Sequence, residues 1–159
     1  MNLIELIIKL VEFPSYTGNI GAIEDCLQYC VDYFKDYEKK IFTRKIKSNG
    51  MPSVLLSNCD TLDYDVLEVG HIDVVPVNSM DMFKPKIIGD IMYGRGVADM
   101  KGPVAVGMEA LEHVIKNNLN LRYGLLIVSD EESGGFNGAK YWTEQLGLKT
   151  KILINGDAG

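Results

Sequence analysis

Apolar residues recur along this chain with two different periods, and segments of the two kinds alternate. Positions spaced as on one face of a helix mark four segments, near residues 2–12, 20–37, 100–118 and 137–146. Five shorter runs are typical of strands, at residues 41–46, 53–57, 64–70, 125–129 and 151–155. The second helix follows the turn-like sequence SYTGN, and Asn19 is a suitable N-cap.

The last two strands contain the continuous apolar runs LLIV and ILI instead of an apolar and polar alternation. Such runs are typical of central strands that are buried on both faces. Their alternation with helices predicts an α/β fold with a mostly parallel central sheet flanked by helices. The sequence contains no internal repeat, low-complexity tract or linker, so residues 1–159 are predicted to form one unit.

Composition and charge exclude several kinds of partner. The 159 residues are 47% hydrophobic and 24% charged, which is ordinary for a globular protein. The formal net charge of -6 argues against nucleic acid and against an anionic membrane, because both would demand a basic face. The opening MNLIELIIKLVEF lacks the basic start and small-residue cleavage site of a signal peptide, so we expect a cytoplasmic protein.

The three cysteines, Cys26, Cys30 and Cys59, form an odd and sparse set. Cys26 and Cys30 are four residues apart on an apolar helical stripe. We therefore predict that the cysteines are reduced core residues without a metal or redox role.

Ionisable residues follow several of the predicted strands directly. His71 and Asp73 come after the strand that ends at Gly70, and the sequence SDEESGG follows the next apolar strand. Asp157 follows the last strand, and Asp99 lies where a helix begins. A single histidine at a strand end, or an acidic run such as DEES, is by itself more often structural or solvated. Because ligands of open α/β sheets bind at the carboxyl ends of the strands, the convergence favours one shared site.

Several carboxylates in one crevice repel each other unless a cation neutralises them. A mixed set of imidazole and carboxylate groups suits zinc, with cobalt or manganese as substitutes. Asp73 can accept a hydrogen bond from the ring nitrogen of His71 that faces away from the metal. The sequence GRGVAD has two glycines of the dinucleotide fingerprint but not the third, and there is no Walker loop or nucleophile elbow.

The motifs GHIDVVP, YGRGVADMKGP, DEESGG and NGDAG occur in this order from residue 70 to the end of the chain. Together they resemble the zinc-dependent amidohydrolase and exopeptidase family of carboxypeptidase G, aminoacylase, acetylornithine deacetylase and succinyl-diaminopimelate desuccinylase. The resemblance runs from the first helix to the last residue. It implies a zinc-exopeptidase-like α/β catalytic domain with two zinc ions, and hydrolysis of an amide bond in a peptide or an N-acyl amino acid.

The resemblance also implies roles for individual residues. Asp73 orients the first histidine, and Glu131 is the general base. The peptide bond after Asp99 is expected to be cis, and Asp instead of Glu at position 157 resembles the peptidase members more than the deacylases. Four residues are implied to be metal ligands, with Asp99 bridging both metals: His71, Asp99, Glu132 and Asp157.

The sequence departs from the family in one respect. Family members continue through a lid or dimerisation domain to a second histidine ligand. His113 cannot replace that ligand, because it lies 14 positions after Asp99 on the predicted helix, about 21 Å along its axis. We therefore expect the N-terminal part of a catalytic domain without the lid, from a full-length protein for which the family suggests a homodimer.

Three expectations follow from this reading of the chain. It should bind one zinc ion tightly and a second weakly or not at all, its hydrolytic rate should be very low, and apolar strand edge should be exposed. The alternative is a non-catalytic metal-binding fragment or interaction module.

Overall fold

A mixed five-stranded sheet lies at the centre of the computed structural model, which describes residues 1–157. Its strand order is β1-β2-β6-β3-β7. Strands β3, β6 and β7 are parallel, whereas β2 is antiparallel to both β1 and β6. The α/β fold is confirmed, with the parallel pairs on one side of the sheet. The strands are β1 (Phe42–Ser48), β2 (Met51–Ser57), β3 (Asp63–His71), β6 (Tyr123–Val128) and β7 (Lys149–Asn155).

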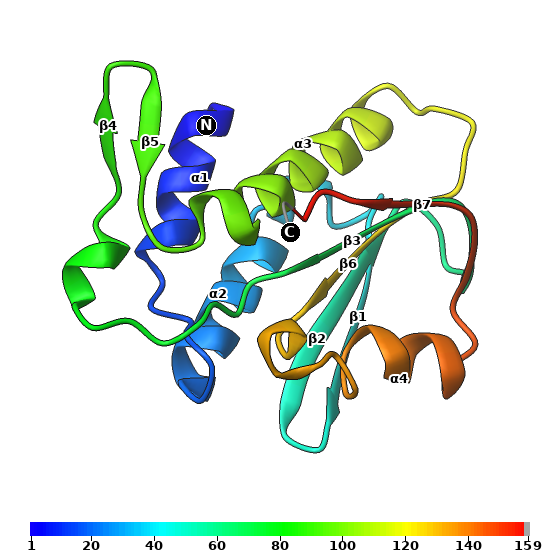
Figure 1. The fold of residues 1–159 in the computed structure, drawn as a ribbon. Coiled ribbons are helices and arrows are strands. Elements are labelled where there is room, and N and C mark those ends of the chain that lie inside the picture. Colours follow the sequence, from blue (N-terminus) through cyan, green and yellow to red (C-terminus); the bar gives the residue numbers. More distant parts are fainter. Residues whose placement is uncertain (158–159) are drawn as a thin grey trace.

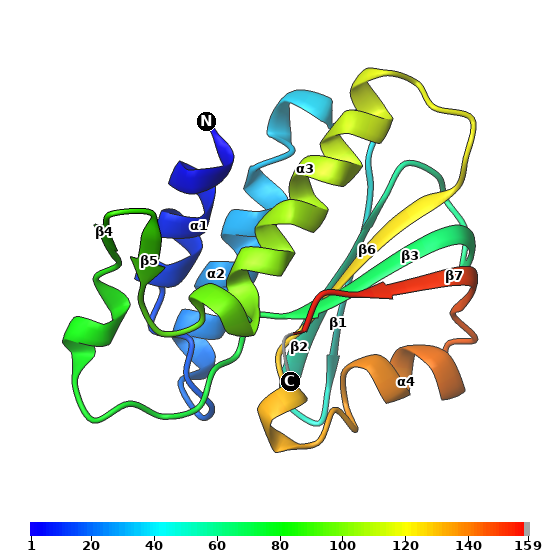
Figure 2. The same ribbon diagram turned by 45° about the horizontal axis from the view of Figure 1, so that its top comes forward.

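Helices cover both faces of this sheet (Figure 1). Helix α3 (Gly102–Lys116) connects β3 to β6, and α4 (Ala139–Glu144) connects β6 to β7. The two connections run in opposite directions across the sheet, so right-handed crossovers place α3 and α4 on opposite faces, as Figure 2 shows. Helices α1 (Leu3–Glu12) and α2 (Ile20–Asp32) lie on the same face as α3. The direction of winding therefore reverses at β6, so the connections that leave β3 and β6 lie on opposite faces, and ligands of open sheets bind beside such a reversal.

Each face of the sheet has its own apolar core. Leu6, Leu10 and Leu111 of the helices pack with Ile127 on the α3 face. On the other face the indole of Trp142 is buried, and its Nε1 donates to Ser53 Oγ at 2.8 Å. Burying a large side chain of this kind contributes about 2–3 kcal/mol, so the short helix α4 is held mainly by Trp142.

All three cysteines are free, as predicted. Cys26 and Cys30 are fully buried in the core between α2 and the sheet. Cys59 is only partly buried at the edge of the other core, so the prediction of a core position is wrong for this residue.

The helix ends follow local capping chemistry. The side chain of Asn2 accepts from Glu5 N at 2.9 Å, and the Glu5 carboxylate accepts from Asn2 N, which forms a capping box. Asn19 caps α2, as predicted. The second helix ends at Asp32 instead of residue 37, because Phe34 turns into the core and the chain continues as a short 3-10 helix.

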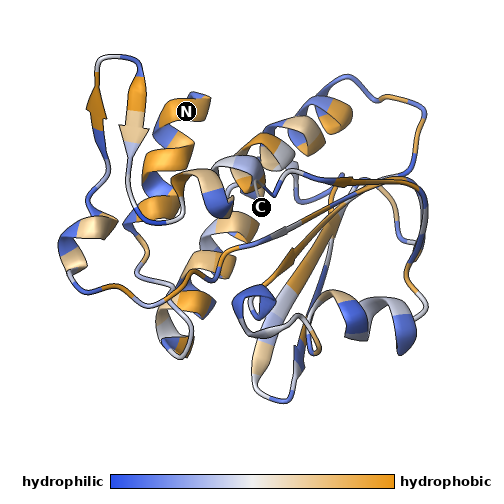
Figure 3. Cartoon of the chain, in the orientation of Figure 1, coloured by the Kyte–Doolittle hydropathy of each residue, from blue (hydrophilic) through white to orange (hydrophobic). Residues whose placement is uncertain are grey.

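A small hairpin, β4 (Lys86–Ile88) and β5 (Ile91–Tyr93), interrupts the segment predicted to be a loop. Gly89 has a φ of +60°, which suits the tight turn between the two strands. Figure 3 shows that the hairpin is strongly apolar. Its Ile88 and Ile91 are 66% and 57% exposed.

Strand β7 differs from its prediction. It lies at the edge of the sheet, and within residues 1–157 it pairs only with β3. Its apolar residues are exposed on both faces: Ile152, Leu153 and Ile154 are 57%, 61% and 43% exposed. The prediction of a strand buried on both faces is therefore correct for β6 and wrong for β7, whereas the expected exposed strand edge is present. Among the helices formed by residues 1–157, none has both the length and the apolar character to cross a membrane.

Candidate metal centre

His71 is the last residue of β3, and its side chain is 1% exposed. Its Nδ1 lies 2.8 Å from the main-chain oxygen of Asp73 and 3.5 Å from Asp73 Oδ1. The nearer acceptor is therefore the carbonyl oxygen, whereas the carboxylate was predicted. His71 Nε2 faces two other carboxylates, at 3.0 Å from Asp99 Oδ1 and 3.7 Å from Glu131 Oε2. The ring is thus fixed through Nδ1 and presents Nε2 to the crevice.

Asp73 is fully buried, and its carboxylate connects two parts of the site. Its Oδ2 accepts from Glu132 N at 3.1 Å, and its Oδ1 accepts from Glu131 N at 3.4 Å. Hydrogen bonds from main-chain N–H groups to a carboxylate are charge-assisted and stronger than neutral ones. Asp73 therefore orients the turn that carries both glutamates in addition to contacting the histidine.

Asp99 lies in a tight turn, Val97–Lys101, directly before α3. The peptide bond between Asp99 and Met100 is cis, as the resemblance predicted. Gly96 precedes the turn with a φ of +87°, and a Cβ atom at this position would lie only 2.9 Å from Val74 Cγ1. Only glycine fits this turn without strain. The carboxylate of Asp99 itself is 52% exposed and faces His71.

Glu131 and Glu132 begin a 3-10 turn after β6, and their carboxylates have different surroundings. Glu132 Oε1 accepts from Val75 N at 3.2 Å. The Glu131 side chain is 49% exposed. The two carboxylates therefore have different partners, as expected of adjacent residues that follow a strand.

Asp130, which was not among the predicted site residues, holds the same turn from the other side. It is buried, its Oδ2 accepts from Asn137 N at 2.7 Å, and its carbonyl oxygen accepts from Gly135 N at 2.8 Å. Its position directly after a buried strand was the available signal. The buried Asp130 fixes the loop, and its neighbours Glu131 and Glu132 remain available to a ligand.

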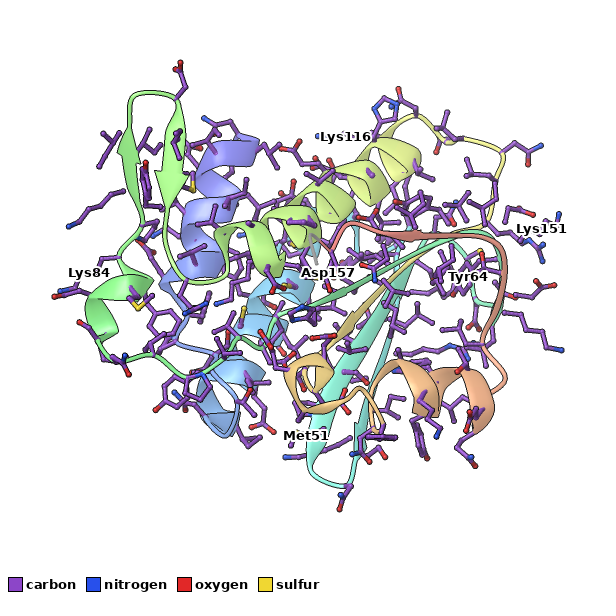
Figure 4. All side chains as sticks on the ribbon, viewed as in Figure 1. Met51, Tyr64, Lys84, Lys116, Lys151 and Asp157 are labelled. Atoms are coloured by element: carbon purple, nitrogen blue, oxygen red, sulfur yellow. The ribbon has the colours of Figure 1, made fainter. Side chains whose placement is uncertain are left out.

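Asp157 follows β7 and reaches the same crevice, near the start of α3 (Figure 4). One donor atom each from His71, Glu131 and Asp157 lie within 4.8 Å of one another. All six residues predicted for the site thus lie at the carboxyl ends of β3, β6 and β7 or in the turn before α3. His113 is exposed near the far end of α3, as predicted.

Burial and the neighbouring carboxylates shift the pKa values of His71 and Glu132. Burial alone would lower the pKa of His71, but the hydrogen bonds and charge of Asp73, together with the charge of Glu131, raise it to about 9. Burial and the charge of Asp99 raise the pKa of Glu132. One imidazole among several carboxylates is a donor set that suits a divalent cation such as zinc. The metal ligands and the general base were assigned by resemblance, and these roles stay predictions.

The chain is similar in sequence to known proteins along most of its length. The chain is 33% identical over 174 aligned positions to a succinyl-diaminopimelate desuccinylase of Orientia tsutsugamushi (strain Ikeda), and 31% identical to the enzyme of that name from Legionella pneumophila (strain Corby). These alignments cover 98% and 96% of this chain but only 42% of each relative. The chain therefore spans less than half the length of these curated relatives.

Solved structures give the same picture of the fold. An M20 family metallo-carboxypeptidase from Sulfolobus solfataricus superposes with a TM-score of 0.81 at 25% identity, covering 100% of this chain and 38% of that one. Human carnosine dipeptidase 1 superposes with a TM-score of 0.77 at 16% identity, over 96% of this chain and 37% of its own.

The family model described as "Peptidase family M20/M25/M40" matches residues 69–158, which begin two residues before His71 and include all six predicted site residues. The match covers more than half of the sequence. The chain therefore belongs to peptidase family M20/M25/M40.

Proposed function

We propose that this chain contributes the metal-binding part of a zinc-dependent hydrolase that cleaves an amide bond in an N-acyl amino acid or a peptide. The observation that carries the proposal is the convergence of donor atoms from His71, Glu131 and Asp157 within 4.8 Å of one another. The relatives named as a desuccinylase and a metallo-carboxypeptidase support cleavage of this kind of bond.

Four residues of the site would bind two ions, and Glu131 would remain free of the metal. His71, Asp99 and Asp157 would hold the first zinc ion, and Asp99 with Glu132 would contribute to a second. When bound, zinc supplies a Lewis acid that polarises a carbonyl oxygen and makes water a stronger nucleophile near neutral pH. The buried His71 ring suits a ligand because its Nδ1 is already held and Nε2 faces the carboxylates.

Glu131 is proposed as the general base. Its carboxylate is 49% exposed and lies at the crevice, 3.7 Å from His71 Nε2. It takes one proton from the attacking water, the water oxygen bonds to the carbonyl carbon, and the carbon–nitrogen bond breaks as Glu131 returns the proton to the leaving amine. Asp73 supports this step because it accepts from the main-chain N–H of Glu131.

We propose a class of substrates, N-acyl amino acids or peptides, and not a single compound. Asp157 favours a peptide substrate by resemblance, whereas the curated relatives named above are desuccinylases. A suitable test panel therefore contains an N-succinyl amino acid, an N-acetyl amino acid and a dipeptide. A cytoplasmic location and a homodimer of the full-length protein remain predictions.

Zinc titration by calorimetry, combined with hydrolysis assays on this panel, tests the proposal. We expect one tight zinc equivalent that is lost in His71→Ala, a weaker second equivalent, and slow hydrolysis that Glu131→Gln abolishes while zinc still binds. A folded chain that binds no zinc would overturn the metal site. Two tight equivalents would show that a further ligand lies outside the proposed set.

A second candidate is metal binding without turnover. It is favoured by the presence of only one histidine, His71, at the site within residues 1–157. Tight zinc binding without hydrolysis of any compound in the panel would support this candidate over the enzyme.

A further inference from the structure

The two residues whose side chains approach most closely at the centre come from different loops. His71 ends β3, and Asp99 lies in the turn before α3, 28 positions later in the chain. Their 3.0 Å contact joins a buried ring to a carboxylate that is 52% exposed. Because the Asp99 carboxylate is half exposed, its position depends on what fixes the backbone of its turn as well as on its contact with His71.

One short segment of chain contacts the loop of His71. Ser15 is fully buried, and its Oγ donates to the carbonyl oxygen of Ile72 at 2.6 Å. The main chain of the same segment pairs with Val74, because Val74 N donates to Ser15 O at 3.1 Å and Thr17 N donates to Val74 O at 2.9 Å. The residues on both sides of Asp73 are therefore attached to this segment.

The same segment also contacts the turn of Asp99. Lys101 is fully buried, and its Nζ donates to the carbonyl oxygen of Phe13 at 2.7 Å. That oxygen also accepts from Ser15 N at 2.8 Å, and the main-chain N–H of Lys101 donates to Gly96 O at 2.8 Å. The turn is thus attached to the segment at Phe13 through the lysine side chain.

Burial of a lysine ammonium is costly unless its charge is paired. No carboxylate in residues 1–157 lies within ion-pair distance of Lys101 Nζ. Besides the Phe13 oxygen, the ammonium has the ring of Phe83 at 5.7 Å. A methionine-sized apolar side chain would fill this space at lower cost, so packing alone does not explain a lysine here.

We propose that Ser15 and Lys101 are positioning residues that attach the loops of His71 and Asp99 to the segment of residues 13–15, and so set the relative placement of these two ligands for a metal ion. This inference rests on the proposed function, because it assumes that both residues bind the metal. Neither positioning residue touches the metal or the substrate. Supporting contacts of this kind typically change metal affinity by about 10–100-fold.

The test compares Lys101→Met, Ser15→Ala and the double variant with the unchanged chain. Lys116→Met is the matched control, since that lysine is 53% exposed and pairs with Glu112 on the surface of α3. Three quantities are measured: zinc affinity by calorimetry, the visible absorption of bound Co²⁺, which depends on ligand geometry, and unfolding by urea. We expect each single variant to lower zinc affinity about 10–100-fold and to alter the Co²⁺ spectrum, while the control changes neither.

A purely structural role would lower resistance to urea but leave zinc affinity and the Co²⁺ spectrum of the folded protein unchanged, and that result would overturn the proposal. Should Lys101→Met fail to fold, Ser15→Ala decides, because it removes only one hydroxyl group. We expect the double variant to lose less affinity than the sum of the single losses, since both residues anchor the same segment. If the unchanged chain binds neither metal, the proposed function fails; if it binds and the variants do not differ from it, only this inference fails.

Discussion

Replacement of Asp73 by asparagine tests how the site is held together. The carboxylate is fully buried and accepts two main-chain hydrogen bonds, from Glu131 N and Glu132 N. Asparagine has the same size, but one of its two terminal groups is an NH₂ that cannot accept. One N–H group therefore loses its acceptor, and the other keeps only a neutral hydrogen bond.

The expected loss in the free energy of unfolding follows from these two hydrogen bonds. A buried donor without an acceptor costs about 1–3 kcal/mol, and a hydrogen bond to a charged group is about 1 kcal/mol stronger than a neutral one. Asp73→Asn should lower the free energy of unfolding by about 2–4 kcal/mol. Zinc affinity should fall by about 10–100-fold, because the orientation of His71 and of both glutamates is loosened.

Urea unfolding of the metal-free protein gives the first quantity, and calorimetric zinc titration gives the second. Asp81→Asn is the control, because Asp81 forms an exposed ion pair with Lys84 in which both side chains are 74% exposed. The control should change the free energy of unfolding by less than about 1 kcal/mol and leave zinc affinity unchanged. Asp73→Asn with control-like stability and affinity would refute the reasoning.

Three further predictions concern the glutamates and the core. In the complete enzyme, Glu131→Gln should abolish turnover with both metals retained, whereas Glu132→Gln should lose one metal; metal analysis and assays of both variants would expose a reversed assignment. Burial raises the pKa of Glu68 above its ordinary 4.5, against the hydrogen bond from Tyr123. The protonated Glu68 side chain therefore contributes its full stability below pH 4.5, and this stability is lost as the pH rises through the raised pKa. Glu68→Gln should remove this fall in the free energy of unfolding, measured by urea unfolding between pH 4.5 and 8. Gly107→Ala should destabilise the protein by about 1–3 kcal/mol in thermal unfolding, because the new Cβ would lie 2.6 Å from Glu68 Oε1. The Cβ of Gly21→Ala would meet nothing within 4 Å, so this variant should stabilise α2 by about 0.5 kcal/mol in the same assay.

The fold was predictable where local pattern and tertiary context agree. The run in β6 is apolar and its residues pack into the cores on both sides of the sheet, so it is buried on both faces as its sequence indicates. The run in β7 is equally apolar but has a neighbour on one side only within residues 1–157. The hairpin β4–β5 was missed because three-residue strands are too short to show a period. The pattern of apolar residues predicts which type of secondary structure a segment can form, whereas the burial of that segment depends on the elements that pack against it.

The site was predictable to the extent that it depends on strand ends. His71 ends a parallel strand, and Glu131 and Asp157 follow two others; the carboxyl ends of neighbouring parallel strands lie at one edge of the sheet. The supporting residues were not predictable in this way. Lys101 and Ser15 act on carbonyl oxygens of distant residues, and every residue except proline presents the same main-chain groups. No sequence signal shows which carbonyl oxygen a buried lysine will reach.

The acidic residues of the site differ in burial, and this difference affects how several carboxylates can lie close together without a cation. Asp73 and Asp130 are buried, and each accepts hydrogen bonds from main-chain N–H groups. Asp99 and Glu131 are about half exposed, so water can hydrate their charges and screen their mutual repulsion. The buried pair holds the loops through these hydrogen bonds, whereas under the proposed function Asp99 would exchange water for a cation and Glu131 would face the attacking water. Hydrogen bonds within the chain therefore order the two loops, and the more exposed carboxylates remain accessible from the crevice.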